Sequence, residues 1–398
     1  MRALQYRQLA RQLQDQTTAL LRRLLRPRDF SGRCTALVLL TCLVLAAARR
    51  LTLAAVAALR RACPSRETLR QALYATLPGY DALRRRLPAL LRATLPRGLR
   101  RHPGRRRYPM AIDLHRVPYY KRGRTPPPHV RKGQRLAGTR YAHDYATASL
   151  LRKGQYYVVA VTPYDPGESL ADVSRRLLRQ AAGLGFAPRY VLMDRTFWSA
   201  DVFRYLQRAR YPFLIPVQAR GKKATAPGGP TGTQAFLHGC PSGRYSYRVA
   251  NRRKQTALVT ILVQCRNHAG HQGKHGRYAW AYAAWRVDLA TARSAQESYR
   301  RRFRIESSYR LLETGRGRTS SRDEGLRLWY VVLAVLLVNQ WLQLRRQASR
   351  LWGAGEAGQC WCLPLLAALA QVLLEMPAAP EGANPGQTPA PQGLPPTP

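Results

Sequence analysis

The stretch PRYVLMDRTFW, Pro188 to Trp198, decides the fold expected for this chain. Its apolar run predicts a buried β-strand that ends at Asp194. An amphipathic segment, SADVFRYLQRAR, and a second apolar run, YPFLIPVQ, follow it and predict a helix and another strand. Strand, helix and strand in this order are typical of an α/β domain.

The residues before this stretch extend the same pattern. YPMAIDLHRVPYY, residues 108–120, predicts a strand that leads to Asp113, and YATASLLRKGQYYVVAVTPY predicts two strands joined by a turn. The amphipathic SLADVSRRLLRQAAGLG then predicts a helix with a glycine stop. We therefore expect a mixed sheet with flanking helices over residues 106–218 and 291–350, interrupted by a β-rich insertion over residues 219–290.

The ends of the chain have other compositions. Residues 1–105 are rich in Ala, Leu and Arg with breaks at prolines, which predicts an all-helical domain. Within it, residues 51–77 have the outline of a helix-turn-helix with Ser65 as the N-cap, although helix pairs of this kind are common in any helical domain. A C-terminal helix over residues 351–375 and a disordered, Pro-rich tail over residues 376–398 complete the prediction.

Charge points to the kind of partner. The 398 residues include 67 Lys and Arg against 20 Asp and Glu, a net charge of +47, while 45% of the chain is hydrophobic. A folded protein with so basic a surface is expected to bind a large polyanion, nucleic acid first and an anionic membrane second. The excess of arginine over lysine also fits a GC-rich coding sequence, so codon bias explains part of the charge.

Cysteines and apolar runs bear on the compartment. Seven cysteines without a framework spacing favour reduced thiols in a cytoplasmic, nucleoid-associated protein, and no export signal is evident. Residues 35–48 are too short to cross a bilayer about 30 Å thick. Residues 328–344 are long enough, but Asn339 and two glutamines make a buried core helix the preferred interpretation, so no membrane partner is expected.

Three acids stand out against this basic background. Asp113 and Asp194 each end an apolar strand, and Glu306 lies in the helical segment YRRRFRIESSYR, residues 299–310. Three carboxylates about 4 Å apart would repel by about 4 kcal/mol per pair at an effective dielectric near 20, so they would protonate or bind cations. Mg²⁺ suits such oxygen ligands. Two such metal ions bound close together activate the attacking hydroxyl and stabilise the leaving oxygen in phosphodiester chemistry. The alternatives are helix or turn caps for the aspartates and a surface ion pair for Glu306.

AIDLHRVPYY, YVLMDRTFW and YRRRFRIESSYR, in this order, resemble the three acidic motifs of insertion-sequence DDE transposases, which have a ribonuclease H-like core. Tyr299, Arg302 and Glu306 resemble the Tyr-Arg-Glu-Lys signature of one transposase superfamily. That superfamily carries a β-strand insertion between the second Asp and the Glu. The 112 positions from Asp194 to Glu306, against 81 between the aspartates, leave room for one.

The resemblance implies DNA cleavage and strand transfer at the ends of a mobile element. It implies two Mg²⁺ or Mn²⁺ ions, transposon-end and target DNA as partners, and a homodimer in the DNA complex. The implied catalytic residues and metal ligands are Asp113, Asp194 and Glu306. The implied DNA contacts are Tyr299, Arg302, Arg310 and Arg316.

One position departs from the signature, because Glu313 stands where the family has a lysine that contacts DNA phosphate. Arg310 or Arg316 is a candidate to replace that contact. The departure is the main argument for one alternative, a DNA-binding remnant that has lost catalysis. A stand-alone nuclease of similar fold is a second alternative.

A competing metal site is weaker. Cys265, His268, His271 and His275 are ligand types that zinc accepts, but the segment is glycine-rich and basic, which favours a solvated hairpin loop. His115 follows Asp113 by two positions, so it shares that face of the predicted strand, in either a structural or a catalytic role.

Overall fold

The computed structural model divides the chain into two compact units. The first comprises residues 1–83, 314–337 and 347–398, and the second comprises residues 84–313 and 338–346. The residues that the structure describes are 2–59, 63–120, 126–136, 138–152, 155–222, 228–238, 240–267, 277–287, 293–300, 312–313, 315–352, 369 and 371. The predicted helix over 351–375 and the predicted tail over 376–398 therefore fall almost entirely outside them.

The first unit is helical, as the sequence predicts. Its N-terminal helices are α1 (Arg2–Leu25), α2 (Ala36–Arg49), α3 (Leu53–Leu59) and α4 (Arg66–Thr76). The apolar run at residues 35–48 forms α2, whose Thr35 accepts a hydrogen bond from the backbone N–H of Val38 as the N-cap. The helix α4 begins at the predicted N-cap, since Ser65 accepts from the N–H of Thr68. A loop returns to this bundle where the N–H of Arg318 donates to the carbonyl of Leu51.

The second unit begins with α5 (Tyr80–Ala93), most of which belongs to it, and α6 (Arg97–Arg101). Residues 84–105, which the sequence pattern assigned to the N-terminal helical domain, thus belong to the unit that holds the sheet. Further helices of this unit are α7 (Leu170–Gly183), α8 (Ala200–Arg208) and α9 (Gln234–His238), with short 3-10 turns η1 (Pro103–Arg105) and η2 (Arg195–Phe197). Residues 293–300 are helical as well.

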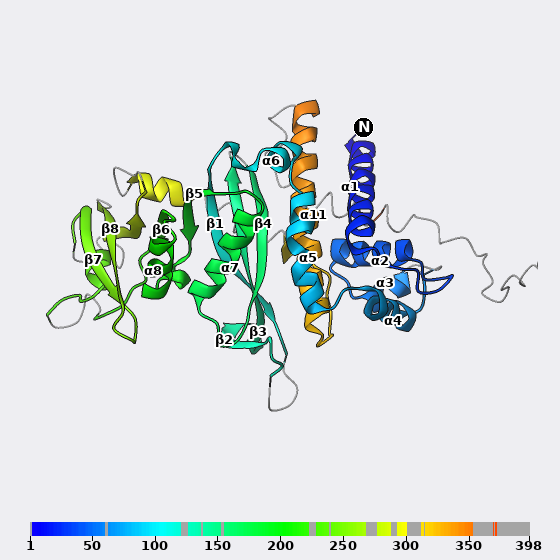
Figure 1. Cartoon of the computed structure of the whole chain (residues 1–398), viewed down its shortest axis with the longest axis horizontal. Coiled ribbons are helices and arrows are strands. Elements are labelled where there is room, and N and C mark those ends of the chain that lie inside the picture. The colour runs from blue at the N-terminus through cyan, green and yellow to red at the C-terminus, as the bar shows by residue number, and fades with distance from the viewer. Residues whose placement is uncertain are drawn as a thin grey trace, which may run out of the picture. The chain divides into compact units, whose positions relative to one another are not determined.

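A nine-stranded mixed sheet forms the core of this unit (Figure 1). The predicted strands are present as β1 (Tyr108–Pro118), β3 (Thr139–Arg152), β4 (Gln155–Tyr164), β5 (Pro188–Met193) and β6 (Phe213–Pro216). They lie in the order β4-β3-β1-β5-β6, with β1, β5 and β6 parallel and β3 antiparallel to both of its long neighbours. A short strand that the pattern did not predict, β2 (Arg131–Leu136), also pairs with β3. The strands are buried over most of their length, which explains their apolar runs.

The predicted insertion forms strands that continue this sheet. It contains β7 (Gly243–Ala250), β8 (Thr256–Asn267) and β9 (Arg277–Trp285). The last of these pairs antiparallel with β6, where Leu214 faces Ala284. The insertion thereby covers an edge of β6 that would otherwise expose unpaired backbone groups.

The long apolar segment near residue 330 forms α11 (Glu324–Trp352), which is long and apolar enough to cross a membrane over Glu324–Leu344. Its most apolar window is wholly buried inside the structure, which confirms the predicted core helix. A second candidate would need α2 and α3 together, bent by 103°.

A buried side-chain amide in α11 forms hydrogen bonds with the backbone of β4. The side chain of Asn339 accepts from the N–H of Val158 at 3.0 Å and donates to its carbonyl at 2.9 Å. Val158 pairs with Ser149 of β3 beside a register shift, and β4 has no strand on its other side among the described residues, so its free backbone groups there need another partner. The same amide donates to the hydroxyl of Thr94 at 3.0 Å, so a fully buried polar side chain has its hydrogen bonds satisfied.

Candidate active site and nucleic-acid interface

Two of the predicted acids lie next to each other in the sheet. Strands β1 and β5 are parallel neighbours, and their register pairs Ile112 with Met193. Asp113 and Asp194 each follow that pair directly. Since neighbouring strands lie about 4.8 Å apart, the two aspartates occupy adjacent positions on neighbouring strands.

The prediction that the first strand ends at Asp113 is wrong, because β1 continues to Pro118 through its pairing with β3. Asp113 therefore lies inside the strand and is 8% exposed. Its Oδ1 accepts a hydrogen bond from the backbone N–H of Leu114 at 2.9 Å. His115 is also buried, and strand alternation places it on the same face as Asp113. An acid this deeply buried, one strand away from a second acid, is a costly arrangement without a cation or a proton.

Asp194 caps the short turn η2 at the end of β5. Its Oδ1 accepts from the backbone N–H of Thr196 at 2.8 Å, and its Oδ2 accepts from the hydroxyl of the same residue at 2.9 Å. The cap that we considered as an alternative role is therefore present. Each carboxylate oxygen has a second lone pair, so capping fixes the orientation of Asp194 and still leaves acceptor capacity for a cation.

The third predicted ligand, Glu306, lies outside the described residues, and so do Arg302 and Arg310. Within the part of the chain that the structure describes, no three His, Cys, Asp or Glu side chains are grouped closely enough to hold a metal ion. Two members of the predicted triad are thus placed together, and the position of the third stays a prediction.

The other signature residues have different surroundings. Tyr299 is 5% exposed, and its ring lies 5.3 Å from that of Tyr282 on β9. Glu313 is exposed and Arg316 is half-buried. Their roles in DNA contact stay predictions. Of the candidate zinc ligands, only Cys265 is described, and its thiol donates to the carbonyl of Cys240 at 3.2 Å.

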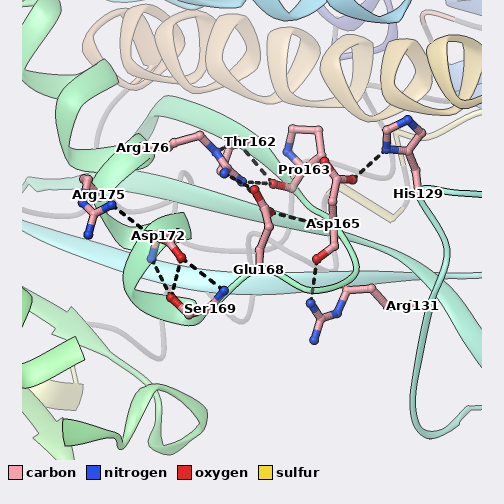
Figure 2. A network of polar contacts seen from close by, with 10 residues as sticks. All are labelled: His129, Arg131, Thr162, Pro163, Asp165, Glu168, Ser169, Asp172, Arg175 and Arg176. Carbon is pink, nitrogen blue, oxygen red and sulfur yellow. Dashed lines mark hydrogen bonds and ion pairs between the residues drawn. The ribbon is translucent and has the colours of Figure 1, made fainter. Parts of the chain in front are cut away.

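A network of ion pairs fixes the loop at the end of β4 (Figure 2). The guanidinium of Arg176 binds the carboxylate of Glu168 and donates to the hydroxyl of Thr162 at 3.0 Å and the carbonyl of Pro163 at 2.7 Å. Glu168 also accepts the N–H of Asp165 at 2.9 Å. Burial alone would raise the pKa of Glu168, but the hydrogen bonds from Arg176 and from the backbone outweigh it and hold the pKa below its usual value.

The same network continues onto β2 and β3. Arg131 donates to the carbonyl of Asp165 at 2.8 Å and lies 3.4 Å above the ring of Tyr164. The buried Asp144 accepts from Arg116 at 3.0 Å and lies 3.5 Å from Arg131. Burial raises the pKa of Asp144 in spite of these two arginines. Sequence reasoning missed Asp144, an acid inside an otherwise apolar strand, and its partners give it a structural role.

A second feature is a basic cleft of about 840 Å³ formed by α7, α8 and the turn between β7 and β8. Six arginines and two aspartates line it. We call it the arginine cleft and define it by these charged residues: Asp172, Arg175, Asp201, Arg204, Arg208, Arg220, Arg252 and Arg253. No pattern in the sequence singled out this cleft, because its arginines come from separate elements and stand out little among so many others.

Several of these charges are already paired. Asp172 caps α7 through Ser169 and binds Arg175 at 2.8 Å (Figure 2). Asp201 accepts from the side-chain amide of Asn251 at 2.7 Å. Arg220 donates to the carbonyl of Trp198 at 3.3 Å and to a neighbouring glutamine. The remaining arginines of the cleft have no acidic partner among the described residues; they are Arg204, Arg208, Arg252 and Arg253.

Part of the chain is similar to a known protein family. Residues 146–337 match the model of the transposase DDE domain. That segment includes Asp194 and the position of Glu306, whereas Asp113 precedes it. No curated protein matches the chain.

The fold is also found among solved structures. The chain resembles the piggyBac transposase in the cryo-EM structure of its synaptic complex with hairpin DNA, at a TM-score of 0.50 and 13% identity. The likeness covers 94% of this chain and 80% of the other. That transposase has a ribonuclease H-like core, and this chain likewise has a mixed sheet with flanking helices.

Proposed function

We propose that this chain is a DDE transposase, an enzyme that cleaves DNA and transfers strands with divalent metal ions, and that Asp113, Asp194 and Glu306 hold its metals. The observation that carries the proposal is the parallel register of β1 and β5, which makes the two aspartates neighbours. The third ligand is assigned from the sequence signature alone.

The donor set fits hard cations. Carboxylate oxygens are the ligands that Mg²⁺ prefers, with Mn²⁺ as a close substitute. Two such ions, once bound, stabilise the attacking and the leaving oxygen of a phosphodiester displacement. The chain itself orients the ligands: the amide of Leu114 fixes Asp113, and Thr196 fixes Asp194. The number of metal ions, two, and their identity as Mg²⁺ both belong to the proposal.

Three amide substitutions test the ligand set: Asp113→Asn, Asp194→Asn and Glu306→Gln. Loss of an outer-shell partner typically costs 10- to 100-fold in activity, so loss of a ligand should reduce metal-dependent DNA cleavage by more than about 100-fold. DNA binding and the urea midpoint should change little. Cleavage would be followed on a labelled duplex that carries the element's end.

Glu297→Gln is the matched control, since Glu297 lies in the same C-terminal part of the second unit, exposed and paired only with Arg293 among the described residues. It should cleave like the parent protein. Full cleavage by any one of the three ligand variants would exclude that residue from the triad.

We further propose that the partners are the element's two ends and a target duplex, bound by a homodimer in the cytoplasm. The net charge of +47 supports a DNA partner. The match to a transposase domain favours this function over both alternatives, a lapsed DNA-binding remnant and a stand-alone nuclease.

We assign recognition of the ends to α3 and α4, because the exposed face of α4 carries Arg66, Arg70 and Gln71. Arg66→Ala combined with Gln71→Ala should reduce the preference for end DNA over random duplex by about 1–3 kcal/mol for each base pair that is no longer read. Competition binding measures that preference. An unchanged preference would locate recognition elsewhere in the chain. Removing residues 1–105 is a poor test, since Thr94 bonds Asn339 in the second unit.

A further inference from the structure

We propose that the arginine cleft binds the sugar-phosphate backbone of the duplex that flanks the phosphodiester being cut. The proposal rests on the proposed function of the chain in DNA cleavage. It adds a DNA-contacting surface built on α8 and the β7–β8 turn, whose residues belong neither to the signature segment nor to α4.

The charge of the cleft selects a polyanion. Both of its aspartates are occupied, one by Ser169 and Arg175 and the other by Asn251. Of the six arginines only Arg175 binds an acid, and Arg220 binds a carbonyl and a glutamine. The guanidinium groups of the other four make no hydrogen bond or ion pair among the described residues, so their charge is available to an outside ligand. A pocket for a small molecule is usually lined mainly by apolar side chains, whereas this one of about 840 Å³ is lined by six arginines. The guanidinium of arginine can donate two parallel hydrogen bonds to the oxygens of one phosphate, so four arginines suit a row of phosphates.

The position of the cleft connects it to the acids. Helix α7 follows the carboxyl end of β4, and α8 follows Asp194 at the carboxyl end of β5. Arg220 follows the carboxyl end of β6, which is parallel to β5. All three parts therefore start from the sheet edge at which Asp194 lies, which is where open α/β sheets bind ligands. Ser199 and Ala200, five and six positions after Asp194, line the cleft, so the backbone that flanks a duplex held at Asp194 can reach it.

The β7–β8 turn is built to hold its arginines in place. The Oδ1 of Asn251 accepts from the N–H of Arg253 at 3.0 Å and of Gln255 at 2.9 Å, which closes the turn. Its side-chain amide ties the turn to Asp201 on α8. Lys254 adopts a φ of +57°, a left-handed conformation that lets the chain reverse within the turn. The two arginines on the turn are thus fixed opposite α8 before any ligand binds, which lowers the entropic cost of binding.

Salt dependence of DNA binding tests the proposal on the full chain. Two double variants remove the unpaired arginines, Arg204→Ala with Arg208→Ala on α8 and Arg252→Ala with Arg253→Ala on the turn. Because each phosphate that is no longer neutralised lowers the log–log salt slope by about 0.9, each double variant should lower it by roughly 1.8. The probe is a duplex that carries the element's end with long flanks, measured by fluorescence anisotropy.

The matched control is Arg107→Ala with Arg189→Ala. Both residues are exposed, and they lie beside the amino ends of β1 and β5, at the opposite edge of the sheet. This pair removes the same charge and should leave the slope within about 0.5 of the parent value, because every neutralised phosphate keeps its arginine. Equal slopes for cleft and control variants would overturn the proposal.

Two further measurements separate the possible failures. Arg252→Lys with Arg253→Lys keeps the charge and should keep most of the slope, so a loss in the alanine variant that the lysine variant shares would indicate a damaged turn and contradict the proposal. Cleavage by the Asp113→Asn variant is scored separately. If it cleaves while the cleft variants lose slope, the ligand assignment fails and the cleft stands; the reverse result leaves the ligands and rejects the cleft.

Discussion

The arginines of the second unit fall into two groups with opposite surroundings. At the end of β4, Arg116, Arg131 and Arg176 are each bound to carboxylates or carbonyls of the loop and of β3. In the arginine cleft, Arg204 and Arg253 face no acid among the described residues. Both groups are made of the same side chain and lie in the same unit.

The difference follows from the shortage of acidic residues, because 20 Asp and Glu cannot neutralise 67 Lys and Arg. Where a guanidinium is partly buried, the fold places an acid beside it, since a buried unpaired charge is costly. Where it is near the surface, water solvates it and its charge remains for a polyanion. Pairing thus separates arginines that stabilise the fold from arginines that are available to DNA.

The largest effect that would sharpen this contrast is on stability. Arg176→Met keeps the apolar stem but leaves Glu168 without its guanidinium partner. Breaking a fully buried pair costs about 3–5 kcal/mol; here the side chains are 27% and 24% exposed, so we expect a loss of about 2–3 kcal/mol in the free energy of unfolding. Urea denaturation at pH 7 measures it.

The cleft supplies the control for that measurement. Arg252→Ala with Arg253→Ala removes two exposed arginines and should change the free energy of unfolding by less than about 0.5 kcal/mol. If the Arg176 variant were as stable as this one, the division between structural and DNA-binding arginines would not hold.

A smaller effect should appear on acidification. The folded state holds the pKa of Glu168 below its ordinary value of 4.5, so the charged form is favoured in the folded protein. That stabilisation is present above pH 4.5 and is lost as the pH falls through the lowered pKa. Glu168→Gln should therefore be less stable than the parent at pH 7 and approach it in stability as the pH falls well below 4.5.

The measurement is the urea midpoint of both proteins from about pH 7 to about pH 3. Glu297→Gln, at an exposed position, controls for the loss of one carboxylate. A difference between parent and Glu168→Gln that stays constant across this range would show that the ion pair with Arg176 does not set the pKa of Glu168.

Much of the fold was predictable because its strands contain apolar runs and are buried over most of their length. The existence of β1, β3, β4, β5 and β6 follows from such runs, and Ser65 marks the start of α4 through ordinary capping chemistry. The continuation of the sheet into β9 was not predictable, since periodicity identifies a strand without identifying its neighbour. The short β2, RKGQRL, has no apolar pattern and forms only by pairing with β3.

The site, too, was only partly predictable from the sequence. Asp113 and Asp194 were identified because an acid after an apolar strand is conspicuous, and their adjacency then depends on which strands pair. The arginine cleft had no comparable signal. Arg204 and Arg208 are four residues apart on α8, but Arg253 reaches them only through the fold of a turn nearly 50 positions later, and such proximity is not encoded in local sequence.

The amide of Asn339 has a consequence for the order in which the protein is made. Its partner Val158 lies 181 positions earlier in the chain, and Thr94 lies 245 positions earlier. At a synthesis rate of about 5–20 residues per second, Asn339 is synthesised roughly 10–35 s after Val158. During that interval the nascent sheet carries backbone groups of Val158 that only α11 can satisfy, so the sheet reaches its final stability after almost all of the chain has been translated.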